Sequence, residues 1–193
     1  VFINALCFLN KLEECGYDKI SVSINVSVIQ LLSPGFTERI FKLINAMQVK
    51  PSNICIEITE SVFASDFDNI NNIINKLRDA GLQVAIDDFG TGYSSLGREK
   101  ELKVDCMKID KYFIDKLLYT HPNKAITGDI ISIAHRLGHC TVAEGVEYDI
   151  QLQYLKEHRC DRIQGYLISK PLDEEVALDF LNKYSINETD VSW

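Results

Sequence analysis

Two adjacent carboxylates, Asp87 and Asp88, follow a short apolar run and precede a glycine-containing loop. The run at 84–86 is typical of a strand that is buried on both faces. Successive strand side chains point to opposite faces, so both carboxylates can face one site only where the strand turns into its loop. The alternative is a helix cap followed by a solvated turn, because Asp is common at both positions.

Polar residues also stand at the C-terminal ends of the other predicted strands. We expect strands at 20–26, 53–58, 82–87, 104–109, 140–144 and 161–166. Apolar residues at helical spacing predict helices at 1–15, 36–48, 68–80, 123–137, 148–157 and 173–184. Near the C-terminal ends of the strands stand Asn25, Glu57, Asp87 with Asp88, Lys108, Glu144 and Gln164.

Strands that alternate with helices indicate an α/β protein with a parallel sheet. The sheet could be open and doubly wound, or closed as a TIM-like (β/α) barrel. No G-x-G-x-x-G follows the first strand, and polar groups at the end of every strand would ring a single mouth in a barrel. We therefore expect a barrel, with residues 1–193 as one domain that ends in a tail at about 185–193.

The polar ring offers oxygen ligands to a metal. Asn25, Glu57, Asp87, Asp88 and Glu144 are hard donors that suit Mg²⁺ or Mn²⁺, and four crowded carboxylates need a cation or protons to offset their repulsion. Two such ions, roughly 3.5–4 Å apart, are a common device for phosphodiester cleavage.

The remaining polar residues of the ring leave alternatives open. Lys108 could orient a water or neutralise a phosphate oxygen, or it could be a structural ion-pair partner. Asn25 could instead be a turn residue at the end of a strand, and Gln164 could bond to a loop backbone rather than to a substrate.

Composition narrows the class of protein. The net charge of −8 over 193 residues argues against binding to a nucleic-acid polymer through a basic surface. The six cysteines form no C-x-x-C pair, and three of them, Cys55, Cys106 and Cys140, lie in strand-like runs. This pattern indicates small buried residues in a reducing cytoplasm. We see no signal peptide and no apolar run long enough to span a membrane.

Six motifs, in order, resemble those of one family. They are Ser-Ile-Asn-Val-Ser at 23–27, Glu-Ile-Thr-Glu-Ser at 57–61, Asp-Asp-Phe-Gly-Thr-Gly-Tyr-Ser-Ser-Leu at 87–96, Lys-Ile-Asp at 108–110, Ala-Glu-Gly-Val-Glu at 143–147 and Gln-Gly-Tyr at 164–166. From about residue 1 to 184, the chain resembles the EAL domain, the cyclic di-GMP phosphodiesterase. The reaction that this resemblance implies is hydrolysis of one phosphodiester of cyclic di-GMP to the linear dinucleotide.

The resemblance also implies a role for each residue. Asn25, Glu57, Asp87 and Asp88 look like metal ligands, and Glu144 looks like an acid beside the attacking water, as a ligand or a base. Lys108 looks like the lysine beside that water, and Gln164 like a glutamine of the site. Glu60 resembles the glutamate that anchors the loop at roughly 89–100, which in the family couples the site to dimerisation. A homodimer and an upstream sensory or GGDEF-type domain are therefore expected, and the parent could be membrane-tethered.

One departure from the family pattern is the absence of the Glu-Ala-Leu motif from these residues. We expect that motif upstream of Val1, on one of two further strands, so that six of the eight barrel strands lie in this chain. On that expectation, the 193-residue chain alone hydrolyses cyclic di-GMP poorly and self-associates through its open edges. Two other functions stay open. One is a module that binds the nucleotide or a protein without cleavage, and the other is an unrelated magnesium barrel enzyme that abstracts a proton beside a carboxylate.

Overall fold

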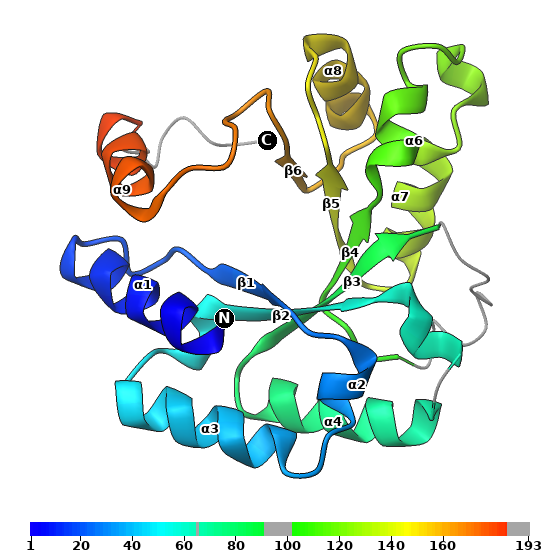
Figure 1. The fold of residues 1–193 in the computed structure, drawn as a ribbon. Coiled ribbons are helices and arrows are strands. Elements are labelled where there is room, and N and C mark those ends of the chain that lie inside the picture. The colour runs from blue at the N-terminus through cyan, green and yellow to red at the C-terminus, as the bar shows by residue number, and fades with distance from the viewer. Residues whose placement is uncertain (65, 91–101, 185–193) are drawn as a thin grey trace.

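The computed structural model describes residues 1–64, 66–90 and 102–184. Its strands form one parallel sheet in chain order. They are β1 Val22–Asn25, β2 Ile54–Thr59, β3 Gln83–Phe89, β4 Cys106–Ile109, β5 Cys140–Glu144 and β6 Arg162–Gln164. The order of the described strands never reverses, as it would in a doubly wound sheet. Figure 1 shows this sheet curving into part of a barrel, which confirms the predicted (β/α) barrel fold.

Helices lie around the outside of the curved sheet, and the last of them stands beside the first (Figure 1). They are α1 Phe2–Glu14, α2 Val28–Leu31, α3 Phe36–Met47, α4 Phe67–Asp79, α6 Lys111–Lys116, α7 Thr127–Arg136, α8 Asp149–Glu157 and α9 Glu174–Lys183. The described residues also form short 3₁₀ helices, which are η1 Pro51–Asn53, η2 Glu60–Ala64 and η3 Pro122–Lys124. The helix predicted at 123–137 begins later than expected because its first residues belong to η3.

Two short helices, α2 and α6, were not predicted from the sequence. Each begins at a side-chain cap: the Ser27 side chain accepts a hydrogen bond from the Gln30 amide, and the Asp110 carboxylate accepts one from the Tyr112 amide. A cap of this kind stabilises the first turn by about 1 kcal/mol, so it can start a helix too short to show a periodic apolar pattern.

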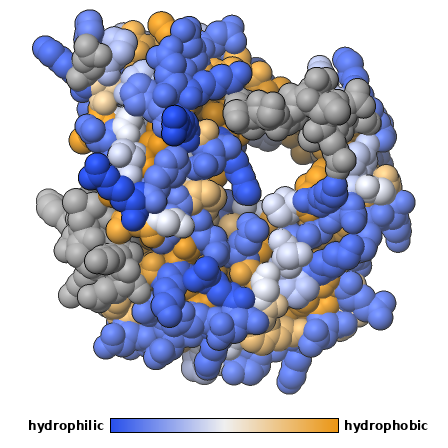
Figure 2. Space-filling model, turned by 180° about the vertical axis from the view of Figure 1, so that it is seen from behind, coloured by the Kyte–Doolittle hydropathy of each residue, from blue (hydrophilic) through white to orange (hydrophobic). Residues whose placement is uncertain are grey.

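The core lies between the sheet and the helices. The side chains of Ile56 and Ile58 on β2 are fully buried, as are those of Ile70, Ile74 and Leu77 on α4. Each such side chain contributes about 1.5–3 kcal/mol through burial. On the face shown in Figure 2, hydrophilic residues occupy most of the surface, and hydrophobic ones lie mainly in the recesses between them.

The base of the sheet, where the strands begin, is held by a network around Asp161. Its Oδ2 accepts hydrogen bonds from the Thr141 amide (2.7 Å) and hydroxyl (2.8 Å), and lies 2.8 Å from Nε2 of His135. Burial alone would raise the pKa of Asp161, but the hydrogen bonds from His135 and Thr141 outweigh it and lower that pKa. The network joins α7, β5 and the start of β6.

The first and last strands of the described sheet, β1 and β6, each pair with one neighbour. Beside them, α1 and α9 lie close together (Figure 1). Lys11 forms an ion pair with Glu174, and the Tyr17 hydroxyl donates a 2.8 Å hydrogen bond to Asn182. The predicted tail at 185–193 lies outside the described residues. Among the helices that the structure describes, none has the length and apolar character needed to cross a membrane.

Candidate active site

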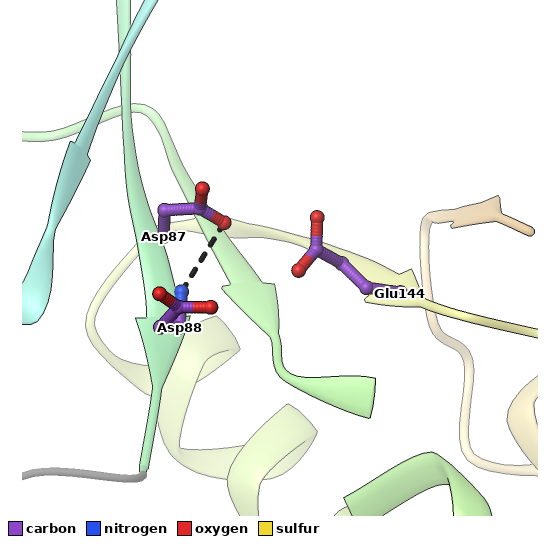
Figure 3. Close-up of side chains that lie close together, drawn as sticks. All are labelled: Asp87, Asp88 and Glu144. Carbon is purple, nitrogen blue, oxygen red and sulfur yellow. Dashed lines mark hydrogen bonds between the residues drawn. The ribbon is translucent and has the colours of Figure 1, made fainter. Parts of the chain in front are cut away.

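The end of β3 turns both aspartates toward one side. Asp88 has a left-handed backbone, with φ of 57°, and the pairing of β3 with β4 shifts register between Ile86 and Phe89. This irregularity breaks the alternation that would otherwise place the two carboxylates on opposite faces. The Asp88 amide also donates a 3.2 Å hydrogen bond to Oδ1 of Asp87. Figure 3 shows both carboxylates and that of Glu144, from β5, facing one space.

These three carboxylates form a group that could hold a metal ion. One oxygen from each of Asp87, Asp88 and Glu144 lies within 4.8 Å of the other two. Parallel strands bring their C-terminal ends to the same edge, so residues 57 positions apart in the chain meet there. The donors are all carboxylate oxygens, which fit a hard divalent cation such as Mg²⁺ or Mn²⁺.

Lys108 lies among the acidic side chains. Its Nζ is 2.8 Å from Glu57, 2.9 Å from Asp87 and 2.6 Å from Glu144, and the lysine side chain is only 6% exposed. Burial disfavours the charged ammonium, but hydrogen bonds to Glu144, Glu57 and Asp87 outweigh that effect and raise the pKa of Lys108. Lys108 is therefore a positive charge that pairs with three acids of the site, and its role beside a water or phosphate stays a prediction.

The surroundings of the site disfavour the charged forms of Glu144 and Asp88. Burial raises the pKa of Glu144, and Asp87 and Glu57 add repulsion, while Lys108 opposes the shift. Burial also raises the pKa of Asp88, with further contributions from Asp87 and from a hydrogen bond with Asp110.

Asp110 is a residue of the site to which sequence reasoning gave no role. It caps α6 through the Tyr112 amide and also faces Asp88. The sequence carried a signal, because the Lys-Ile-Asp motif at 108–110 was noted, but only its lysine was given a role.

The two outer members of the predicted ring lie at the ends of the sheet. Asn25 on β1 pairs in register with Glu57, and Gln164 on β6 pairs with Glu144. All four therefore stand at the same edge, where the strands end. The side chains of Asn25 and Gln164 are exposed, and their contact with a metal or substrate stays a prediction.

Glu60 begins η2, directly after β2, and its side chain is buried. Its Oε2 accepts a 3.2 Å hydrogen bond from the amide of Gly90, the second residue of the loop predicted at roughly 89–100. A Cβ at Gly90, where φ is +95°, would stand 2.8 Å from the Phe113 ring, so the backbone there packs closely. Residues 91–101 of that loop lie outside the described part of the chain.

Comparison with known proteins identifies the family. The family model described as the EAL domain matches residues 1–171. The chain belongs to the EAL domain family. It is 42% identical over 160 residues to the probable cyclic di-GMP phosphodiesterase PdeB of Escherichia coli K12, which covers 83% of this chain and 30% of PdeB. The chain spans between about a fifth and a third of the length of the curated relatives it matches.

Solved EAL domains have the same fold. The EAL domain of Mycobacterium smegmatis DcpA superimposes with a TM-score of 0.88 at 36% identity, over 94% of this chain and 82% of that one. The PaMucR phosphodiesterase in complex with c-di-GMP gives a TM-score of 0.86 at 31% identity, over 91% of this chain and 71% of that one. The predicted membership of the EAL family and its fold are therefore confirmed.

Proposed function

We propose that this EAL domain hydrolyses one phosphodiester bond of cyclic di-GMP to give the linear dinucleotide, with Mg²⁺ or Mn²⁺ as cofactor. The observation that carries the proposal is the group of Asp87, Asp88 and Glu144 around the charged Lys108. Support comes from PdeB, named as a probable cyclic di-GMP phosphodiesterase, and from PaMucR, a phosphodiesterase solved with c-di-GMP.

The charge balance of the site fits a divalent cation. Glu57, Asp87 and Glu144 all pair with Lys108, and Asp88 and Asp110 add two more acids beside them. Lys108 alone neutralises only part of this charge, and burial together with repulsion between the acids raises the carboxyl pKa values of Asp88 and Glu144. Asp87, Asp88 and Glu144, with Asn25 and Glu57, are the residues that would hold the ion. When bound, it would act as a Lewis acid on the phosphoryl group and make a water more acidic.

The protein's own residues have separate roles in the hydrolysis. Glu144, whose pKa is raised, is suited to accept a proton from the attacking water. Lys108 remains charged and can donate hydrogen bonds to phosphoryl oxygens that gain charge in the transition state. Gln164, beside Glu144 in the register, would orient the substrate or water. The water oxygen bonds to phosphorus, and the bond from phosphorus to the ribose oxygen breaks. That oxygen takes up a proton from solvent and leaves as a hydroxyl.

Several finer expectations from the sequence and from the resemblance remain predictions. They concern a homodimer, an upstream sensory or GGDEF-type domain, a cytoplasmic location and the choice between Mg²⁺ and Mn²⁺. The anchoring role of Glu60 belongs with them, and its hydrogen bond to Gly90 supports it.

The test is an assay of the full-length protein and of residues 1–193 with cyclic di-GMP, in Mg²⁺, Mn²⁺ or EDTA. Chromatography separates the linear product from the cyclic substrate. From the full-length protein we expect a linear dinucleotide only when a divalent ion is present, and from residues 1–193 we expect little. Asp87→Asn in the full-length protein should abolish product formation. Asp115→Asn is the matched control, because Asp115 is an exposed carboxylate paired with Lys111.

Binding measured by calorimetry separates the alternatives. If the full-length protein binds cyclic di-GMP but forms no product in either metal, the domain is a receptor and the proposed hydrolysis is wrong. If it neither binds nor cleaves the nucleotide, a screen with small carboxylic acids tests the magnesium-enzyme alternative.

A further inference from the structure

A small cluster of thiols lies beneath the acidic site and takes no part in the proposed chemistry. Cys55 on β2 and Cys106 on β4 pack with Ala85 in a buried group, and Cys140 on β5 packs against it. Cys106 is two residues before Lys108, so the two side chains share one face of β4. All six cysteines of the chain are free thiols.

Two of these thiols are direct neighbours. Cys106 and Cys140 are register partners on the adjacent parallel strands β4 and β5. Neighbouring strands lie about 4.8 Å apart, which is inside the Cα separation of about 4.4–6.8 Å that a disulfide requires. The two thiols are hydrogen-bonded to each other. Cys55 is not a direct neighbour of Cys106, because β3 lies between β2, which carries Cys55, and β4, which carries Cys106.

The two thiols differ in exposure, because Cys106 is buried and Cys140 is half-buried. The hydrogen bond from Cys106, with help from the positive charge of Arg162, lowers the pKa of Cys140 even though burial opposes it. The same hydrogen bond and burial raise the pKa of Cys106. A thiolate is the form that reacts with peroxides, and within residues 1–193 Cys140 is half-buried. An activated thiol beside a second thiol is the arrangement found in redox-sensing cysteine pairs.

We propose that Cys106 and Cys140 are a redox site that forms a reversible disulfide with hydrogen peroxide as the oxidant. The Cys140 thiolate attacks one peroxide oxygen, the O–O bond breaks, and the leaving hydroxide takes a proton to become water. Cys140 is then a sulfenic acid. The sulfur of Cys106 attacks that sulfur, the S–O bond breaks, and the departing hydroxide leaves as water with the Cys106 proton. Two thiols lose two electrons, the peroxide gains them, and a small-molecule dithiol reverses the reaction.

This disulfide would join β4 to β5 directly below the ion pair of Lys108 with Glu144, whose atoms are 2.6 Å apart. The proposal concerns the thiols themselves and does not depend on the hydrolysis proposed above.

The experiment uses the chain with Cys7→Ser and Cys15→Ser, which removes the two exposed thiols. The protein is treated with hydrogen peroxide, quenched with catalase, unfolded and alkylated, and then examined by intact mass and non-reduced peptide mapping. We expect two of the four remaining thiols to become unreactive to the alkylating agent, with a mass loss of two hydrogen atoms. The linked peptides should be those of Cys106 and Cys140, and dithiothreitol should restore both thiols.

Two further variants in that background test the roles within the pair. Cys106→Ser should leave a sulfenic acid on Cys140 that dimedone traps, and Cys55→Ser should still form the link to the full extent. Far-UV circular dichroism checks that both variants fold. The proposal is overturned if all four thiols stay reactive, if the link includes Cys55 or Cys160, or if Cys140 passes directly to a sulfinic or sulfonic acid that dithiothreitol does not reduce.

Discussion

Replacing Lys108 with methionine should destabilise the protein strongly in metal-free buffer. The substitution keeps the length of the side chain but leaves three carboxylates, at 2.6–2.9 Å from the lost ammonium, without their counter-charge. Removing one partner from a buried ion pair costs about 3–5 kcal/mol. Glu144 and Asp87 retain 16% and 14% exposure of their side chains, so water screens part of the effect. We therefore expect a loss of about 3 kcal/mol in the free energy of unfolding at pH 8.

Urea unfolding followed by circular dichroism, in EDTA and in Mg²⁺, measures this loss. A cation bound only to the folded state at one hundred times its dissociation constant adds about 2.7 kcal/mol to stability. Since Mg²⁺ replaces a missing counter-charge, it should raise the stability of Lys108→Met more than that of the parent.

The control is Lys111→Met, in which the lost lysine also pairs with two carboxylates, at 2.8 and 2.9 Å, but is 46% exposed. Exposed pairs contribute at most about 1 kcal/mol, so this variant should change little. Equal losses in the two variants, or a loss from Lys108→Met that Mg²⁺ leaves unchanged, would refute the account of Lys108 as the counter-charge of the site.

Three further substitutions test other contacts. Glu60→Ala removes the acceptor of the Gly90 amide and should lower the metal affinity, measured by calorimetry, without removing a ligand. Gly165→Ala would place a Cβ 2.1 Å from the Val146 carbonyl oxygen. We therefore expect the free energy of unfolding, measured by thermal unfolding, to fall by about 1–3 kcal/mol. Asp161→Asn should lower stability by about 1 kcal/mol at pH 7. The pKa of Asp161 is lowered in the folded protein, so its carboxylate stabilises the fold fully above the pKa of the unfolded chain, about 3.9. The stability difference between Asp161→Asn and the parent should therefore vanish as the pH falls from about 3.9 through the pKa of Asp161 in the folded protein.

The parallel sheet and the edge that carries the acids could be predicted from the sequence. Apolar runs end in polar residues, and parallel strands place all their C-terminal ends on one side of the sheet. Local patterns were therefore enough to predict that Glu57, Asp87 and Glu144 lie at the same edge. The order of the described strands then confirmed the choice of the barrel over the doubly wound sheet.

The arrangement of charges could not be predicted in the same way. The sequence places Lys108 at the end of a strand, but its three simultaneous ion pairs depend on how β2, β3 and β5 curve around it. Asp110 was missed because its position against Asp88 is set by the start of α6, a helix too short for a periodic pattern.

The left-handed backbone of Asp88 links the fold to the site. An aspartate at φ of 57° is less favourable than one in the usual strand conformation by roughly 1–2 kcal/mol. The contacts around it supply the compensation. The Asp88 amide bonds to Asp87, and Glu60 holds the Gly90 amide two residues later, at a glycine whose φ of +95° suits that residue type alone. These hydrogen bonds lie at the register shift after Ile86, where two successive carboxylates come to stand beside Glu144.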